Sequence, residues 1–193
     1  TRSWSDDLST ALLGIHPGAT GRVLQQRYGQ AFSAAYREDN SPDTAAADIQ
    51  QLERLPQQKG LAISLYRPAG AEAGELRLKL YHAGEPISLS DVLPVLENMG
   101  VRVIDERPYG IEPADGEPCW IHDFGLSHDP ALQLDAGSLR ETFQQAFAAI
   151  WHGETDNDGF HRLILRSGLG WRDISILRAY TQYLRQAGSA YSQ

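Results

Sequence analysis

The chain has 193 residues, of which 41% are hydrophobic and 22% charged, and its formal net charge is −8, with Lys59 and Lys79 as the only lysines among 17 basic residues. This composition predicts a globular chain, and the length suits one compact domain, or one small domain with helical extensions, and is enough for a single hydrophobic core. The acidic balance argues against nucleic acid or an anionic membrane as a partner, because both require a basic surface. The single cysteine, Cys119, excludes a disulfide framework within the chain and fits a reducing cytosol, and no apolar run approaches the ~20 residues of a membrane span.

Residues 1–40 form a first block with the apolar periodicity of helices. A first helix is expected to end at Gly14 and Pro17, and a second is expected over Arg22–Tyr36. The stripe of the first helix consists of Trp4, Leu8, Ala11 and Leu12.

Residues 41–130 form a mixed block. A helix is expected to start at the Ser41 cap with Pro42 in its first turn. A second helix is expected to start at Ser90 and to end before Gly100. Alternation of apolar and polar residues predicts four strands. They cover residues 61–66, 76–82, 101–107 and 119–126.

This order, α-β-β-α-β-β, is the ferredoxin-like arrangement with its first strand moved to the end. It predicts an α+β sandwich in which both helices cover one sheet face. The sheet is expected to run in the order third, fourth, second, first strand, with the two central strands adjacent and parallel.

The other sheet face is expected to carry basic residues of the second strand beside an acid of the fourth. Strand alternation places Arg77 and Lys79 there with Asp123, and we predict an ion pair between Asp123 and one of the two. Tyr81 and Ile121 on the same face indicate that it is covered, by the terminal helices of the chain or by another domain.

Residues 131–193 form a third block that reads as helical again. Ser138 is expected to cap one helix, Asp156 and Gly168 to bracket a short one, and Trp171 to precede the last.

Signatures of catalysis are weak along the chain. Gly168-Leu169-Gly170 follows a helix and lacks the third glycine of a dinucleotide-binding turn, so a loop is the better interpretation. No Walker A motif and no Gly-x-Ser-x-Gly elbow occur in the sequence. Cys119 on a strand is more simply a small buried residue than a nucleophile.

Two His-Asp pairs, His122-Asp123 and His128-Asp129, are the densest metal-like pattern, but zinc or iron requires three or four converging ligands. We expect His122 to be packed and hydrogen-bonded. The charge runs 37–39 and 105–107 are interpreted as solvated faces or interdomain ion pairs.

Several runs of the sequence resemble the large bacterial NAD-dependent glutamate dehydrogenases, and together they extend over nearly the whole chain. They are Tyr-Gly-Gln-Ala-Phe-Ser-Ala-Ala-Tyr-Arg-Glu-Asp at 28–39, Leu-Arg-Leu-Lys-Leu-Tyr-His at 76–82, the run at 87–109 from Ile-Ser-Leu-Ser-Asp to Glu-Arg-Pro-Tyr, Trp-Ile-His-Asp-Phe at 120–124, 157–165, and Leu-Arg-Ala-Tyr-Thr-Gln-Tyr-Leu-Arg-Gln at 177–186. The start lacks an initiator methionine and a signal peptide, so we expect a piece of a longer protein.

The resemblance implies an ACT-like domain at 41–130 upstream of the catalytic domain, preceded by a helical segment at 1–40 and followed by one at 131–193 that leads to the rest of the enzyme. It implies oxidative deamination of L-glutamate with NAD for the parent, in the cytoplasm and as a homo-oligomer. It places no catalytic, cofactor-binding or metal residue in this chain, so NAD is expected to bind elsewhere in the parent.

Amino-acid effectors of ACT domains often bind near a helix–strand turn at a domain interface. Met99-Gly100-Val101 is such a turn, with Asn98 beside it. The candidate effector or interface residues are Asn98, Gly100, Arg77, Lys79 and Asp123. Three hypotheses remain: a regulatory or assembly module of the dehydrogenase, a free-standing ACT-type amino-acid sensor, and a small enzyme in its own right.

Overall fold

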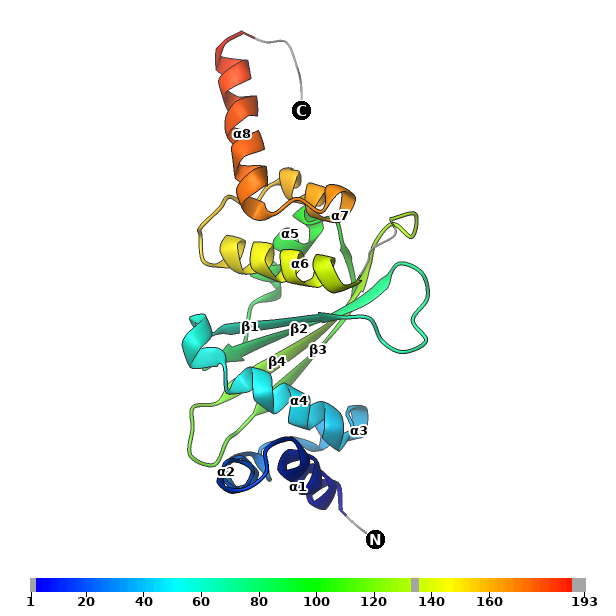
Figure 1. Ribbon diagram of the computed structural model, residues 1–193, viewed down its shortest axis with the longest axis vertical. Helices are drawn as coiled ribbons and strands as arrows, with labels where there is room; N and C mark the ends of the chain where they lie inside the picture. Colours follow the sequence, from blue (N-terminus) through cyan, green and yellow to red (C-terminus); the bar gives the residue numbers. More distant parts are fainter. Residues whose placement is uncertain (1–2, 133–135, 189–193) are drawn as a thin grey trace. The chain divides into compact units, whose positions relative to one another are not determined.

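A computed structural model describes residues 3–132 and 136–188 of the chain (Figure 1). The chain divides into two compact units, and the four strands of the sheet contribute to both. The first unit comprises residues 1–63, 79–87 and 106–123, and the second comprises residues 64–78, 88–105 and 124–193.

Four short α-helices and a 3-10 turn build the N-terminal part of the first unit. They are α1 (Trp4–Ile15), α2 (Ala19–Tyr28), α3 (Ala34–Asp39), α4 (Pro42–Leu52) and η1 (Leu55–Gln58). Ser3 caps α1 in a reciprocal capping box with Asp6, and the Ser41 hydroxyl accepts the Thr44 N–H at the start of α4.

The helix predicted over Arg22–Tyr36 is wrong, because it is two helices in the structure. α2 ends at Tyr28, and Phe32 forms an isolated antiparallel bridge with Ile111. Ser33 then accepts the Tyr36 N–H and caps α3. The apolar periodicity continues across the break, so the tertiary pairing of Phe32 decides the backbone.

The sheet has the order β1-β2-β4-β3, as predicted. Its strands are β1 (Leu61–Tyr66), β2 (Glu75–Ala83), β3 (Arg102–Ile111) and β4 (Cys119–Ser127). The edge strand β1 also donates the Leu65 N–H to the side-chain oxygen of Gln144 on α6, at 3.0 Å.

The prediction that β2 and β4 are parallel is wrong, because they are antiparallel. The Gly84 N–H, just after β2, donates to the Pro118 carbonyl just before β4, and the His128 N–H after β4 donates to the Gly74 carbonyl before β2. The reason lies in the connections. The crossover through α5 leaves β3 parallel to β2, and the β3–β4 hairpin then reverses the chain.

The register of these two bonds places Lys79 of β2 directly opposite Asp123 of β4. Both side chains are buried, with exposed fractions of 4% and 7%. The sheet face predicted to be covered is indeed covered by the chain itself. Its residues pack into one core with α1–α4, and they include Ala62, Tyr81, Tyr109, Ile111, Cys119 and Ile121.

The second unit contains the remaining helices. They are α5 (Leu89–Asn98), α6 (Ala136–Trp151), η2 (Gly159–Arg162), α7 (Leu163–Ser167) and α8 (Trp171–Gln186). α5 and α6 pack against each other (Figure 1). α5 starts after Ser88 rather than after Ser90, whose hydroxyl instead pairs with that of Ser88. Gly100 ends it with a φ of +90°, as expected for a C′ glycine.

The expectation that α4 and α5 form one helical layer is wrong. α4 packs with α1 in the first unit, whereas α5 packs with α6 and η2 in the second. The predicted α+β architecture with flanking helices holds, but α6 is the helix that accompanies α5. Asp48 on α4 explains the difference, because it is the ion-pair partner of Lys79, a buried residue of β2.

A buried ion pair ties α4 to β2. The Lys79 ammonium lies 2.8 and 3.0 Å from the two carboxylate oxygens of Asp48, and the hydroxyls of Tyr36 and Tyr81 also donate to that carboxylate. Burial, followed by the charge of Asp48, raises the pKa of Tyr36, so its hydroxyl keeps its proton and acts as a donor. The four bonds satisfy a charge that would otherwise be costly to bury.

We predict that Asp48→Ala destabilises the chain by about 3–5 kcal/mol, because it leaves the buried Lys79 ammonium without this counter-ion. Chemical denaturation measures the loss. Asp43→Ala in the first turn of the same helix is the matched control, with a cost of about 0.3–1 kcal/mol. A cost below about 1 kcal/mol for Asp48→Ala would contradict the assignment. The double variant with Lys79→Met is expected to cost less than the two single changes together.

Candidate functional site

A pocket of about 540 Å³ opens at the turn between α5 and β3, within the second unit. Gly100 and Val101 of the turn line it, together with the end of β4 and with η2 and α7. A Cβ on Gly100 would lie 3.5 Å from Leu165 and 3.6 Å from Arg162, in ordinary contact, so the positive φ rather than the space is what requires glycine here.

Three arginines line the pocket: Arg102, the first residue of β3, Arg162, the last of η2, and Arg166 in α7. Arg162 and Arg166 are four residues apart in consecutive helical turns, and that spacing places them on one face. All three are exposed, and the side chain of none forms a hydrogen bond or ion pair with any residue in ranges 3–132 and 136–188. The pocket therefore presents guanidinium groups whose donors are available to a ligand.

Histidine and acidic groups complete the polar lining. The Nδ1 of His128 lies 2.9 Å from the Asp129 carbonyl oxygen, which can only accept, so Nδ1 carries the proton. The Asp129 carboxylate accepts the Ala131 N–H and thereby holds its own loop. Glu97 of α5 is the second acid on the lining. Three guanidinium groups against two carboxylates make the lining basic.

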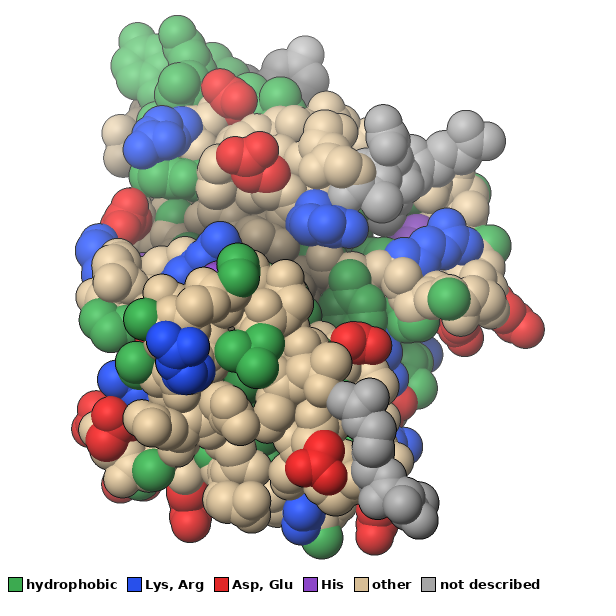
Figure 2. All heavy atoms as spheres, turned by 60° about the horizontal axis from the view of Figure 1, so that its bottom comes forward, with side chains coloured by type: hydrophobic (Ala, Val, Ile, Leu, Met, Phe, Trp, Pro, Cys, Tyr) green, Lys and Arg blue, Asp and Glu red, His purple; other side chains and the backbone are tan. Residues whose placement is uncertain are grey.

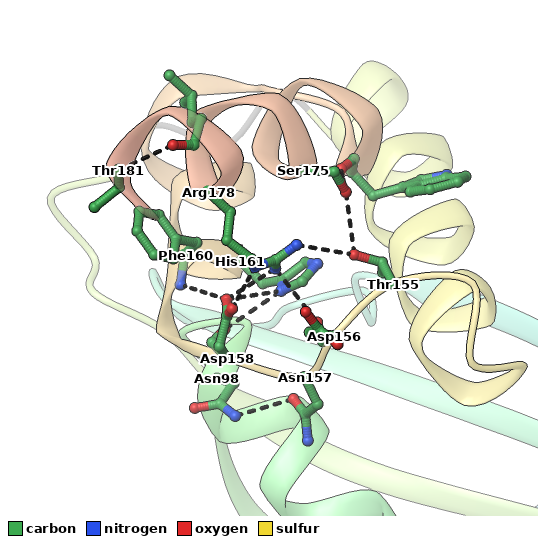
Figure 3. A network of polar contacts seen from close by, with 12 residues as sticks. Asn98, Thr155, Asp156, Asn157, Asp158, Phe160, His161, Ser175, Arg178 and Thr181 are labelled. Carbon is green, nitrogen blue, oxygen red and sulfur yellow. Dashed lines mark hydrogen bonds and ion pairs between the residues drawn. The ribbon is translucent and has the colours of Figure 1, made fainter. Parts of the chain in front are cut away.

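A network anchored on Arg178 of α8 fixes the segment that carries Arg162 (Figure 3). The Arg178 guanidinium donates two bonds to the Asp158 carboxylate and one each to the Thr155 hydroxyl and the Asp156 carbonyl. Asp158 also accepts the Phe160 N–H and so caps η2. Burial would raise the pKa of Asp158, but the bonds from Arg178 and Phe160 hold it below its ordinary value.

Asn98 connects α5 to the same segment. Its side-chain amide donates to the Asn157 side-chain oxygen at 2.9 Å, directly before Asp158 (Figure 3). The end of α5, which leads into Gly100, and the start of η2, which leads to Arg162, are therefore held together. Of the two candidate effector residues near this turn, Gly100 lines the pocket. Asn98 does not line it, but its bond to Asn157 supports the pocket from outside.

His161 lies at the centre of this network and is fully buried. Its Nδ1 lies 3.3 Å from the Asp158 carbonyl oxygen, and its Nε2 has no hydrogen-bond partner among the described residues. Burial lowers the pKa of His161, because a charged imidazolium would lose its hydration there. The side chain is therefore neutral at physiological pH.

The remaining candidate residues lie in the sheet. Lys79 binds Asp48 of α4, and Arg77 binds Asp105 of β3 at 3.1 Å. The register brings Asp123 opposite Lys79, and the ion pair of Asp123 with Arg77 or Lys79 stays a prediction. The charge runs 37–39 and 105–107 are joined by an ion pair, since the guanidinium of Arg107 lies 3.2 Å from the carboxylate of Asp39. This ion pair lies on a solvated face, since the side chains of Arg107 and Asp39 are 58% and 37% exposed.

The other candidate catalytic or metal-binding residues have structural roles. His122 is buried, its Nε2 accepts the Ile87 N–H, and its Nδ1 donates to Glu106, as expected of a packed histidine. Cys119 is buried, and burial raises the pKa of its thiol. Gly168 is the left-handed cap of α7. In the described part of the chain, no three His, Cys, Asp or Glu side chains are grouped as metal ligands would be.

The described helices include none that is long and apolar enough to cross a membrane. On the face drawn in Figure 2, acidic and basic side chains are scattered among each other instead of gathering into one patch. That distribution lacks the basic footprint of a nucleic-acid-binding surface.

Models of three segments of glutamate dehydrogenase match the chain. The ACT3 domain matches residues 60–139, helical motif 2 matches residues 11–55, and helical motif 3 matches residues 155–193. The sheet with α5 is thus an ACT domain, whereas α2–α4 match one helical motif of the same class of enzyme and η2, α7 and α8 match another. The pocket lies where the ACT domain meets helical motif 3, because Gly100 and Arg102 come from the first and Arg162 and Arg166 from the second.

Three relatives, each an NAD-specific glutamate dehydrogenase, match the chain over nearly its whole length. The NAD-specific glutamate dehydrogenase of Halomonas elongata is 45% identical over 192 residues, and that of Pseudomonas aeruginosa is 42% identical over 185 residues. The Mycobacterium tuberculosis enzyme is 36% identical over 197 residues. These alignments cover 96–100% of this chain but only 11–12% of each relative. The chain belongs to the family of large NAD-specific glutamate dehydrogenases and spans about an eighth of their length.

We predict that His161→Phe flattens the dependence of stability on pH between about pH 7.5 and pH 5.5. Because the folded-state pKa of His161 lies below its ordinary value of 6.5, the unfolded state takes up the proton first, and stability falls as the pH falls through this window. Asp158, with a pKa held below 3.8, contributes its stability down to more acidic pH. Thermal unfolding of wild type and variant at both pH values measures the slope.

The matched control is His152→Phe, which removes a partly exposed histidine of the same unit. An equal change of slope in both variants would contradict the assignment to His161.

Proposed function

We propose that the chain is a non-catalytic regulatory and architectural part of a large enzyme that oxidatively deaminates L-glutamate to 2-oxoglutarate and ammonia with NAD. The observation that carries the proposal is the match of ACT3 and two helical motifs along most of the chain, in relatives about eight times its length. In this proposal NAD binds in another part of the parent, and the domain at 41–130 links helical segments at 1–40 and 131–193.

The pocket beside Gly100 supports the regulatory part of the proposal. It lies at a helix–strand turn, where small-molecule sites of mixed folds are common, and it offers three arginines without partners in the described chain. A ligand there contacts Arg162, whose segment is tied to α8 by Arg178 and to α5 by Asn98. Binding is thereby linked to the positions of two helices. An amino acid is the effector class that the resemblance implies.

The outer face of α8 supports the architectural part. It carries five large hydrophobic side chains that are 40–66% exposed, at the spacing of a single helical stripe. They are Ile176, Leu177, Tyr180, Tyr183 and Leu184. A contiguous apolar stripe is typical of a surface that is buried in the complete protein. We propose that the remaining polypeptide of the parent, in the same or a neighbouring subunit of a homo-oligomer, covers it in the cytoplasm.

A second candidate function is a free-standing ACT-type module that senses amino acids, which the open pocket would also suit. The two functions differ in the size of the protein in the cell. An antibody raised against the chain is expected to detect a polypeptide about eight times as long, since the chain spans 12% of its relatives. Detection of a free 21.3 kDa species instead would favour the sensor.

We predict that the purified chain does not form NADH from L-glutamate and NAD, whereas the complete polypeptide that contains it does. The reason is that the chain lacks a phosphate-binding glycine turn between a strand and a helix. NADH absorbance and fluorescence measure turnover and binding. Formation of NADH by the chain alone, at a rate proportional to its concentration, would refute the non-catalytic role.

We predict that Tyr183→Ser destabilises the complete enzyme by about 1.5–3 kcal/mol, because a side chain that is 66% exposed in the chain is buried there. In the isolated chain the same change is expected to cost no more than about 0.5 kcal/mol. Thermal unfolding of both proteins gives the comparison. Gln182→Ser, one position away and outside the stripe, is the control. Equal costs of Tyr183→Ser in chain and enzyme would show that nothing covers α8.

A further inference from the structure

We propose that the pocket at the α5–β3 turn binds a small dicarboxylate through Arg102, Arg162 and Arg166. A planar guanidinium donates paired hydrogen bonds that match the two oxygens of a carboxylate. The three arginines reach the pocket from two separate parts of the chain, the start of β3 and the η2–α7 segment. Two carboxylates of one ligand can therefore be held by different arginines.

The apolar part of the lining distinguishes a dicarboxylate from inorganic phosphate. Val101 and Leu165 are buried and Leu132 is half-buried, and all three line the same pocket as the arginines. Such a surface packs against the carbon chain between two carboxylates, whereas phosphate has no apolar part to place there. The volume, about 540 Å³, suits a molecule of this size with its water.

The lining acids do not cancel the arginines. The carboxylate of Asp129 accepts a hydrogen bond from the Ala131 N–H in its own loop. Glu97 lies on α5 and forms no ion pair with these arginines in the described chain. His128 donates its Nδ1 proton to the Asp129 carbonyl oxygen within the same loop. The site is thus built to favour negative charge.

The inference deepens the proposed function and rests on it for its physiological meaning. Glutamate and 2-oxoglutarate, the substrate and product of the proposed reaction, are themselves dicarboxylates. A dicarboxylate pocket outside the catalytic domain would let substrate or product act on the enzyme from a second site.

Isothermal titration of the chain with glutarate tests the proposal, with butyrate and inorganic phosphate as comparison probes. We expect saturable glutarate binding that weakens as salt is raised, and at least about tenfold weaker binding of butyrate and of phosphate. Binding of phosphate as tight as that of glutarate would show a general anion site and overturn the dicarboxylate assignment. The absence of saturable glutarate binding would overturn the site itself.

Substitution locates the ligand. Arg102→Gln, Arg162→Gln and Arg166→Gln are each expected to weaken glutarate binding about tenfold or more, since each removes a charged hydrogen-bond donor. Arg140→Gln, an exposed arginine of α6 outside the pocket lining, is the matched control and is expected to change nothing. Melting temperatures confirm that the variants fold. An unchanged affinity in all three pocket variants would place the ligand elsewhere.

This measurement is independent of turnover. Failure of glutarate to bind overturns the pocket but leaves the dehydrogenase role standing. Failure of the complete polypeptide to oxidise glutamate overturns that role and leaves a measured dicarboxylate site in place.

Discussion

The buried contact between Asp48 and Lys79 is the constraint on which the first unit depends. An ammonium and a carboxylate that leave water together must meet at hydrogen-bonding distance, and here two tyrosine hydroxyls fill the remaining positions on the carboxylate. This fixes the rotation of α4 about its axis and its height along β2. Hydrophobic packing with α1 alone would tolerate small shifts of the helix, but a four-bonded buried carboxylate does not.

The second unit uses the same principle closer to its surface. Arg178 and Asp158 form a partly buried pair that joins α8 to the turn before η2, and Asn157 extends the connection to α5 through Asn98. Most charged side chains that carry structure in this chain have a partner of opposite sign. The three arginines of the pocket have no carboxylate within ion-pair distance among the described residues, and unlike other exposed arginines of the chain they line one pocket together. This grouping makes the pocket the best candidate for a site that serves a ligand rather than the fold.

The sequence was sufficient for the strands, because period-two alternation marks them, for their order, because the succession of elements matches a permuted ferredoxin-like fold, and for the covered sheet face, because Tyr81 and Ile121 lie on it. It could not locate the break at Phe32, since the apolar stripe continues through it, and it misassigned the layer of α4 because the partner of Asp48 is distant along the chain. The turn at Gly100 was recognisable from its glycine. The other pocket residues were not, because Arg102 and Arg162 are sixty residues apart and only the i, i+4 spacing of Arg162 and Arg166 gave any signal.

The two outer strands of the sheet have a consequence for assembly. An outer strand with free backbone groups invites another strand, and sheets joined in this way can propagate into aggregates. Here the Leu65 N–H of β1 is already bound by the Gln144 side chain, and Ile111 at the end of β3 is already bridged to Phe32. At these two positions an added strand would have to displace part of the chain, so the fold itself guards one point on each outer edge against strand addition.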